Sequence, residues 1–157
     1  MQFEGKYDEF FPTNVAQKLV ELIENNAEEL AKKWLEDIKK NVSAPTYKKY
    51  QNDTELYHRA YRVYSQLGKW ISRDTSKEEI KQYWTDLGVQ RRKEGFTLSE
   101  IILAMIMIRR QLWQKVQSEG LLDTAYDLYQ AMDLFNRVTV FFDQAIFHAI
   151  CGYEAKE

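Results

Sequence analysis

Helix-start signals recur along this 157-residue chain and constrain its fold more than any other feature. Each signal is a residue that can cap a helix, followed three positions later by glutamate. The cap oxygen can accept a hydrogen bond from a free backbone N–H of the first turn, while the glutamate carboxylate reaches back toward the cap. The four pairs are Asn26 with Glu29, Asn52 with Glu55, Ser76 with Glu79, and Thr97 with Glu100. Since no segment alternates apolar and polar residues for long enough to predict a strand, we expect an all-α fold.

The spacing of apolar residues predicts about six helices. Apolar side chains recur every three or four positions between short polar joints, as on the buried face of a helix. Pro45 breaks the chain after the second helix, and Gly95 and Gly120 stand where a helix end requires a left-handed residue. The expected helices are 13–25, 27–41, 53–73, 77–94, 98–118 and 122–153. Because the sequence contains no linker or internal repeat, we expect one domain over residues 1–157, with its core at about 14–154.

Charge and composition exclude several classes of protein. The 22 basic and 24 acidic residues are mixed along the chain, so no patch is predicted that would attract nucleic acid or an anionic membrane surface. The most apolar run, residues 101–108, would span about 12 Å as a helix, against roughly 30 Å of membrane hydrocarbon. The acidic, aromatic N-terminus lacks the apolar core of a secretory signal. We therefore expect a cytoplasmic protein that binds neither nucleic acid nor membrane.

The sequence offers no convergent set of polar groups for catalysis. His58 and His148 lie on different expected helices, and neither has a companion at metal-ligand spacing. Cys151 cannot form an internal disulfide, and it lies near the end of a helix whose dipole disfavours a thiolate. The acidic residues alternate with lysines, as on a solvated face, and no phosphate-binding loop or nucleophile elbow occurs. We therefore expect a non-enzymatic protein with no catalytic residue, no metal and no cofactor.

Two segments, 101–108 and 138–150, are apolar on nearly every side. A helix that is apolar all round must be covered all round. We expect the first segment to be a central core helix. A single chain of this size would struggle to cover both faces of the last helix, which predicts a homodimer. The residues expected at the dimer interface are Val138, Phe141, Phe142, Ala145 and Phe147.

Four runs of sequence resemble the N-terminal sensor domain of RsbR/RsbRD-type proteins, the stressosome co-antagonists of the RsbT kinase. The runs are NNAEELAKKWLEDI, ELYHRAYRVYSQLGKWIS, LGVQRRKEGFTLSEIILAMIMIRRQLW and LFNRVTVFFDQAIFHAICGYE. The likeness covers about residues 14–154, and its most specific pieces are EGFTLSEII, the following Arg-Arg-x-Leu-Trp, and FFDxAI.

The resemblance implies a globin-like helical fold, a homodimer formed by the terminal helices, and a sensory role without catalysis. In that family the domain precedes a STAS output domain of the stressosome, and related domains precede histidine kinases or transcription regulators. We therefore expect a signal, of unidentified chemistry, to pass through the dimer to a downstream output domain or a stressosome-type protein partner. The chain stops just after the last expected helix, where a connection to such a domain would continue.

Residues 87–99, LGVQRRKEGFTLS, place Arg91 where a similar class of sensor has a haem ligand. In globin-coupled haem sensors, which share the implied fold, the spacing Gly-x-x-His-x-x-x-Gly surrounds the histidine that holds the iron. Gly88 and Gly95 match the two glycines, and Arg91 replaces the histidine. A guanidinium is always protonated and has no free lone pair, so it cannot ligate iron. The sequence therefore argues against haem at the usual position.

Alternatives remain open for Arg91 and for the function. Arg91 is either a charged residue on the outer face of its helix or a partner for Glu94. A sharper alternative is that it binds an anionic signal or joins an ion-pair switch. The alternative function is a sensor that holds haem, through His58 or His148, or another flat hydrophobic ligand. Such a ligand would lie in a pocket lined by Trp84, Phe96, Ile101, Met105 and Trp113. A structural adaptor that recruits a partner protein is the third hypothesis.

Overall fold

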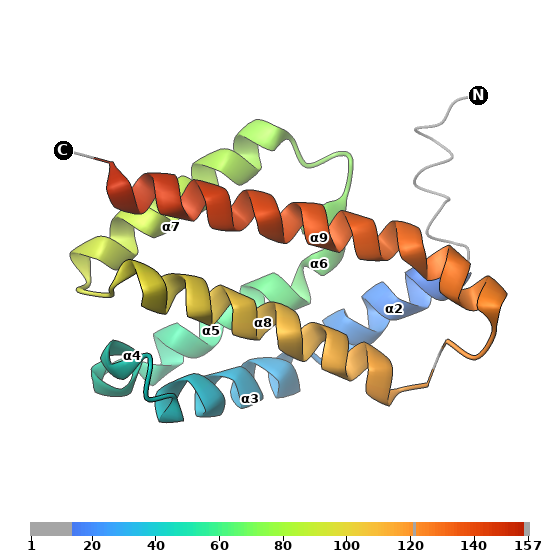
Figure 1. The fold of residues 1–157 in the computed structure, drawn as a ribbon, viewed down its shortest axis with the longest axis horizontal. Coiled ribbons are helices and arrows are strands. Elements are labelled where there is room, and N and C mark those ends of the chain that lie inside the picture. Colours follow the sequence, from blue (N-terminus) through green and yellow to red (C-terminus); the bar gives the residue numbers. More distant parts are fainter. Residues whose placement is uncertain (1–13, 121, 156–157) are drawn as a thin grey trace.

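The computed structural model describes residues 14–120 and 122–155, and every regular element in these ranges is a helix. The helices are α2 (Asn14–Asn25), α3 (Ala27–Lys40), α4 (Pro45–Lys49), α5 (Asp53–Ser65), α6 (Leu67–Ile71), α7 (Lys77–Lys93), α8 (Leu98–Ser118) and α9 (Ala125–Glu154). Figure 1 shows α8 and α9 side by side along one face of the molecule. The expected all-α fold is confirmed, whereas a globin-like arrangement stays a prediction. The helix start expected at residue 13 lies outside the described residues.

The helix expected over 53–73 is divided into α5 and α6. Gln66, between them, has the non-helical dihedral angles φ −118° and ψ 26°. The Glu24 carboxylate of α2 accepts a hydrogen bond of 2.8 Å from the backbone N–H of Gly68, and a Cβ at Gly68 would lie 3.1 Å from the same oxygen. A contact between helices therefore accompanies this break, and local spacing does not record it. Pro45, expected only to break the chain, is the first residue of α4.

Three of the four expected capping residues cap a helix. The side-chain oxygens of Asn52, Ser76 and Thr97 each accept a hydrogen bond from the backbone N–H of the glutamate three residues later. At Thr97 the reciprocal bond is also present, so α8 begins with a complete capping box. Gly95 and Gly120 have φ of 95° and 63°, which confirms the left-handed residues expected after α7 and α8.

Asn26 does not cap α3, and this expectation is wrong. Its side-chain N–H donates instead to the backbone carbonyl of Leu22, at 2.7 Å, where the chain passes from α2 into α3. The last helix also begins later than expected, at Ala125, where the Thr124 hydroxyl accepts a hydrogen bond from the backbone N–H of Asp127. This cap has aspartate where the other signals have glutamate.

α9 packs most extensively on α7, and the two backbones touch where the helices cross. A Cβ at Gly88 of α7 would lie 2.0 Å from the backbone oxygen of Ala149, and a Cβ at Gly152 of α9 would lie 2.0 Å from that of Thr85. Such distances leave no room for a side chain at either position. The two glycines therefore set how closely the last helix approaches the helix that carries Arg91.

α8 is a central helix, but one side of it reaches the surface. Its core-facing residues include Ile101, Met105 and Ile108, which are buried. The residues that are only partly buried are Ile102, Leu103 and Ile106. The expectation that residues 101–108 are covered on every side is therefore wrong for this side of the helix. Within the described ranges, no helix is both long enough and apolar enough to span a membrane.

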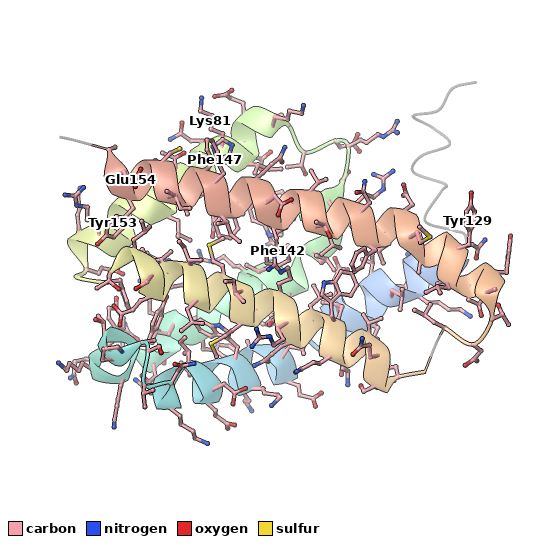
Figure 2. All side chains as sticks on the ribbon, viewed as in Figure 1. Lys81, Tyr129, Phe142, Phe147, Tyr153 and Glu154 are labelled. Carbon is pink, nitrogen blue, oxygen red and sulfur yellow. The ribbon has the colours of Figure 1, made fainter. Side chains whose placement is uncertain are left out.

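Four of the five residues expected at a dimer interface lie in the core of the single chain. Val138, Phe141, Phe142 and Ala145 are at most 2% exposed, because the other helices cover this side of α9. Their assignment to a partner is therefore corrected. Phe147 is 60% exposed, and Figure 2 shows it on the opposite side of α9 from Phe142.

Candidate ligand-binding site

Two arginine side chains reach into the interior: Arg91 on α7 is buried, and Arg59 on α5 is largely buried. Arg91 is 8% exposed as a residue, and the side chain of Arg59 is 10% exposed. Each lies on the buried stripe of its helix: Arg59 follows Leu56 by three positions, and Arg91 follows Trp84 by seven. Burying a guanidinium is unfavourable unless charges and hydrogen bonds compensate for the lost water. The surroundings of these two groups therefore decide what the interior can bind.

The carboxylate of Glu94, at the end of α7, lies between the two guanidinium groups. Arg59 Nη2 donates to Glu94 Oε2 at 2.8 Å, and Arg91 Nη1 lies 3.5 Å from Glu94 Oε1. Gln90 Nε2 and the Tyr50 hydroxyl also donate to Glu94 Oε2, at 3.1 and 3.3 Å. The Tyr50 hydroxyl in turn accepts a hydrogen bond of 3.2 Å from Arg59. We call these five residues the arginine cluster, and it holds two positive charges and one negative charge. A second carboxylate, that of Glu55 on α5, also accepts a hydrogen bond of 3.3 Å from Arg59 Nη2, but its side chain is 46% exposed.

Burial and neighbouring charges act against each other in this cluster. Burial lowers the pKa of Arg91, and the charge of Arg59 lowers it further, which Glu94 offsets only in part. Burial also acts to lower the pKa of Arg59, but the hydrogen bond and charge of Glu94 outweigh it and raise that pKa. Burial acts to raise the pKa of Glu94, yet hydrogen bonds from Gln90 and Arg59 hold it below its ordinary value. Glu94 therefore compensates mainly Arg59, and the charge of Arg91 is the less compensated one.

A cavity of about 40 Å³ adjoins both arginines, where α3, α4, α5, α7 and α8 meet. This volume suits a small group, since a cavity of about 10–15 Å³ by the same measure already admits one water molecule. Burial raises the pKa of Tyr47, which also lines the cavity, to about 12, so its hydroxyl stays protonated. The remaining walls are largely apolar: Trp34, Val63, Trp84, Leu87, Ile101, Ala104, Met105 and Ile108. Apolar walls strengthen charge–charge interactions inside such a cavity.

Two of the residues that line the cavity carry hydrogen-bond donors with no partner among the described residues. The donors are Nε and Nη1 of Arg59 and Nε1 of Trp84, and all three are shielded from solvent. Folded proteins leave few buried donors unpaired, and an unpaired donor on a charged group is especially unfavourable. An anion placed against Arg59 and Arg91 would accept such hydrogen bonds and compensate the charge of Arg91. The arrangement is therefore suited to holding a small anion.

The structure excludes one of the alternatives for Arg91 and shows another. Its expected place on the outer face of α7 is wrong, because the side chain is buried. Its pairing with Glu94, three residues along the helix, is confirmed. The charge of this buried arginine is only partly compensated. The other two alternatives, anion binding and an ion-pair switch, are therefore both compatible with its position.

Three of the five residues expected to line a ligand pocket adjoin the cavity: Trp84, Ile101 and Met105. Phe96 is buried outside the cavity lining, with its ring centroid 4.4 Å from that of Tyr47. Trp113 lies on the outer side of α8, with its ring centroid 4.8 Å from that of Phe135 on α9. Sequence spacing therefore identified α7 and α8 as cavity walls but did not distinguish the two sides of α8.

The residues at this site do not fit haem. A cofactor pocket has a volume of about 300 Å³ or more, far above that of this cavity, and Arg91 has no lone pair for iron. His58 is exposed on α5 with its ring against Tyr61, and His148 on α9 has its ring against Phe147. Neither histidine lines the cavity. In the described part of the chain, no group of three or more His, Cys, Asp or Glu residues could hold a metal ion.

Sequence analysis missed three members of the cluster, Arg59, Tyr50 and Gln90, of which Gln90 lies four residues before Glu94 on the same helix. For Arg59 a signal was available, because its spacing of three from Leu56 and four from Val63 places it on the buried stripe of α5. For Tyr50 no local signal exists. It follows α4 and reaches Glu94 across 44 positions of sequence, so only the tertiary structure brings the two together.

The joined outer sides of α8 and α9 form a second surface of interest, which we call the α8–α9 face. Trp113 of α8 and Phe135 of α9 connect the helices across it. By helical spacing, its other apolar residues are Ile102, Ile106, Met132, Ile146 and Ile150. Met132 is 60% exposed and Phe135 is 54% exposed. The other apolar residues of the face are half-buried. Exposed and half-buried apolar side chains that share one face mark interaction sites in many proteins.

Nearly the whole chain matches a known family model. The model, described as the N-terminal domain of histidine kinases, covers residues 16–155, a range that contains both the arginine cluster and the α8–α9 face. No curated protein and no solved structure matches the chain detectably.

Proposed function

This chain belongs to the histidine kinase N-terminal family, whose members are sensory domains of bacterial signal transduction, and we propose that it senses a small monovalent anion. The anion, a halide or the carboxylate head of an organic acid, binds between Arg59 and Arg91. One observation carries the proposal: two guanidinium groups that share the carboxylate of Glu94 adjoin a cavity whose lining residues have unpaired hydrogen-bond donors.

A monovalent anion suits both the charge and the size of the site. In the interior the two guanidinium groups share the single carboxylate of Glu94, since Glu55, the other partner of Arg59, is 46% exposed. This interior surplus of one positive charge is matched by a single negative charge. A phosphate group, which carries a charge of about −1.5 to −2 at pH 7, would exceed this surplus. The cavity of about 40 Å³ accommodates one ion or a headgroup of a few atoms. A longer apolar tail would have to displace the side chains of the cavity wall.

Anion binding gives the domain a means of changing its packing. The incoming anion competes with Glu94 for Arg59, so the ion pair that closes the end of α7 weakens as the anion binds. A ligand can shift a conformational equilibrium only by binding its two states with different affinity, and this competition provides that difference. In this proposal the domain acts by binding rather than by catalysis.

We also propose that the domain passes its signal on as a homodimer. Two copies of the α8–α9 face would pack as a four-helix interface about a twofold axis and cover Met132 and Phe135. The downstream output is a separate signalling module. The family description favours a histidine kinase in this role, and the resemblance to RsbR-type proteins favours a stressosome STAS domain.

Anion binding is testable in a chloride-free buffer. The purified protein is titrated with sodium chloride or sodium acetate, at an ionic strength held constant with sodium sulfate, and the midpoint of thermal unfolding is recorded. A ligand that binds the folded state alone stabilises it by RT ln(1 + [L]/Kd), so we expect a saturable rise. A response to acetate but not to chloride would assign the site to carboxylates. No saturable rise with either anion would contradict the proposal.

Substitutions in the cluster separate specific binding from a general salt effect. Arg91→Gln removes the less compensated charge and should abolish the response. Glu94→Gln removes the competing carboxylate, so the affinity for the anion should increase, by about tenfold or more. Arg62→Gln on the same helix as Arg59 is the matched control, because Arg62 does not line the cavity, and its titration should equal that of the wild type.

A further inference from the structure

The last turn of α9 is attached to two residues beside Glu94 in sequence, Arg92 and Phe96. Arg92 Nη1 donates to the backbone carbonyl of Tyr153 at 2.7 Å, and the guanidinium lies 5.5 Å from the centre of the Tyr153 ring. The Tyr153 hydroxyl donates to the backbone carbonyl of Phe96 at 2.9 Å. Figure 2 shows Tyr153 at this end of α9, beside the turn between α7 and α8. The helix end is therefore held by residues on both sides of Gly95.

The carbonyl that receives the Tyr153 hydroxyl belongs to a turn that begins at Glu94. α7 ends in a Schellman-type motif, in which the backbone N–H groups of Gly95 and Phe96 donate to carbonyls of the last turn, each at 3.1 Å. Glu94 is the cap residue of this helix, and its carboxylate is held in the interior by Arg59. A change in the position of Glu94 therefore displaces the backbone that carries the Phe96 carbonyl.

The Phe96 side chain makes a second connection to the interior. Its ring centroid lies 4.4 Å from that of Tyr47, which lines the cavity, and 5.5 Å from that of Tyr50, which belongs to the arginine cluster. Phe96 is 1% exposed, so its ring cannot move without displacing these neighbours. One residue thus contacts the cluster through its side chain and the end of α9 through its carbonyl.

We propose that the Arg59–Glu94 ion pair controls how firmly the last turn of α9 is attached, through Phe96 and Tyr153. With the pair intact, the turn after α7 presents the Phe96 carbonyl to the Tyr153 hydroxyl. When a competing anion or a substitution releases Glu94 from Arg59, this turn shifts and the attachment weakens. The inference rests on the proposed function only for the anion that triggers it, since the attachment itself consists of this chain's own residues.

Amide hydrogen exchange of residues 151–155 measures the attachment. Tyr153→Phe deletes the hydroxyl and should accelerate exchange there by about fivefold, the factor that one hydrogen bond contributes. Glu94→Gln, with no contact to Tyr153, should accelerate the same amides by about two- to fivefold. In the double variant the effects should combine to less than their product, because both act on one connection.

Two control variants and the exchange of α8 distinguish a local effect at the end of α9 from a general loss of stability. Tyr129→Phe changes an exposed tyrosine of the same helix, and Glu79→Gln removes an exposed ion pair with Lys69 at the other end of α7. Both should leave residues 151–155 unchanged. The inference is overturned if Glu94→Gln accelerates amide exchange in α8 as much as in residues 151–155. It is also overturned if Glu94→Gln leaves exchange at residues 151–155 unchanged while Tyr153→Phe accelerates it. It is overturned equally if Tyr153→Phe has no effect.

The same exchange measurement with sodium chloride or sodium acetate separates this inference from the proposed function. Saturable stabilisation with faster exchange at residues 151–155 supports both. Stabilisation without a change at these residues supports anion binding and overturns the coupling. If neither anion stabilises the protein and Glu94→Gln still accelerates exchange at the helix end, the attachment is supported and the proposed function fails.

Discussion

At Gly152 even the smallest side chain would collide with backbone atoms. A Cβ at this position would lie 2.0 Å from the backbone oxygen of Thr85, so Gly152→Ala has to push α9 away from α7. We expect a loss of about 3 kcal/mol or more in the free energy of unfolding, at the upper end of overpacking effects. Gly120→Ala is the control, because its φ of 63° is strained for alanine, at about 1–2 kcal/mol, but the space around it is open. Urea unfolding should rank Gly152→Ala as the more damaging change, and the reverse order would refute the close crossing.

Glu100 is a buried carboxylate that serves the starts of two helices. Its oxygens accept hydrogen bonds from the backbone N–H groups of Thr46, at 2.7 Å, and Thr97, at 2.9 Å. Burial acts to raise the pKa of Glu100, but these hydrogen bonds hold it below the ordinary value of 4.5. The folded protein therefore binds this proton more weakly than the unfolded chain does. The resulting stabilisation is fully present above pH 4.5 and is lost as the pH falls through the lower, folded-state pKa.

Replacing Glu100 should therefore change both the stability and its dependence on pH. We expect Glu100→Gln to lower the free energy of unfolding at pH 7 by about 1.5–3 kcal/mol, the range for hydrogen bonds to a charged group. Below pH 4.5 its stability should fall less steeply than that of the wild type. Glu79→Gln, at the matching but exposed position of α7, should change the stability by about 0.5 kcal/mol or less. Urea unfolding between pH 7 and pH 3 tests this, and an unaltered acid dependence in Glu100→Gln would refute it.

At the scale of single helices, two similar sequence signals have different outcomes. Thr97 forms a complete capping box, whereas Asn26 bonds back to the preceding helix. Thr97→Ala should therefore cost about 1 kcal/mol, the typical value of an N-cap, and Asn26→Ala should cost clearly less. Thermal and urea unfolding of the two variants measure this difference. Equal losses would mean that Asn26 caps α3 in solution.

The helices also show where local spacing stops being informative. Periodicity predicted α7, α8 and most of α9 because their buried stripes run through the helix without a break. It did not predict the end of α5, where Gln66 leaves the helix and Glu24 of a distant helix bonds the backbone of Gly68. It also placed the start of α9 three residues early, since the cap at Thr124 is followed by aspartate rather than glutamate.

At the scale of the whole molecule, the α8–α9 face makes the proposed homodimer testable. Phe135→Glu places a charge beside Trp113 in that face and should yield a monomer of 18.7 kDa in light scattering, with unchanged helical circular dichroism. Val42→Glu alters a side chain that is 92% exposed and lies outside the face, so it should leave the dimer intact. A wild-type protein that is monomeric at micromolar concentration would refute the dimer.

Phe142→Glu distinguishes the corrected interface from the one expected from sequence. Had Phe142 faced a partner, this change would separate two folded subunits. Because the ring is 2% exposed inside one chain, the charge would have to be buried, and we expect a loss of roughly 4 kcal/mol or more in the free energy of unfolding. Loss of the circular dichroism signal at ambient temperature is the expected observation. A folded monomer would restore the original assignment.

The sequence by itself determined the helical class, most helix caps and the left-handed glycines, and it offered the pairing of Arg91 with Glu94 as one of several alternatives. Each of these depends on residues within about four positions of one another, which is the range of a helical turn. Tertiary structure decided that Arg59 and Tyr50 join this pair, and which side of α9 is covered. The physical reason is that a periodic pattern shows that one face of a helix is buried without specifying its partner. Which charges meet in the interior depends on how the helices pack: Arg59 of α5 meets Glu94 across 35 positions of sequence, and Tyr50 meets it across 44.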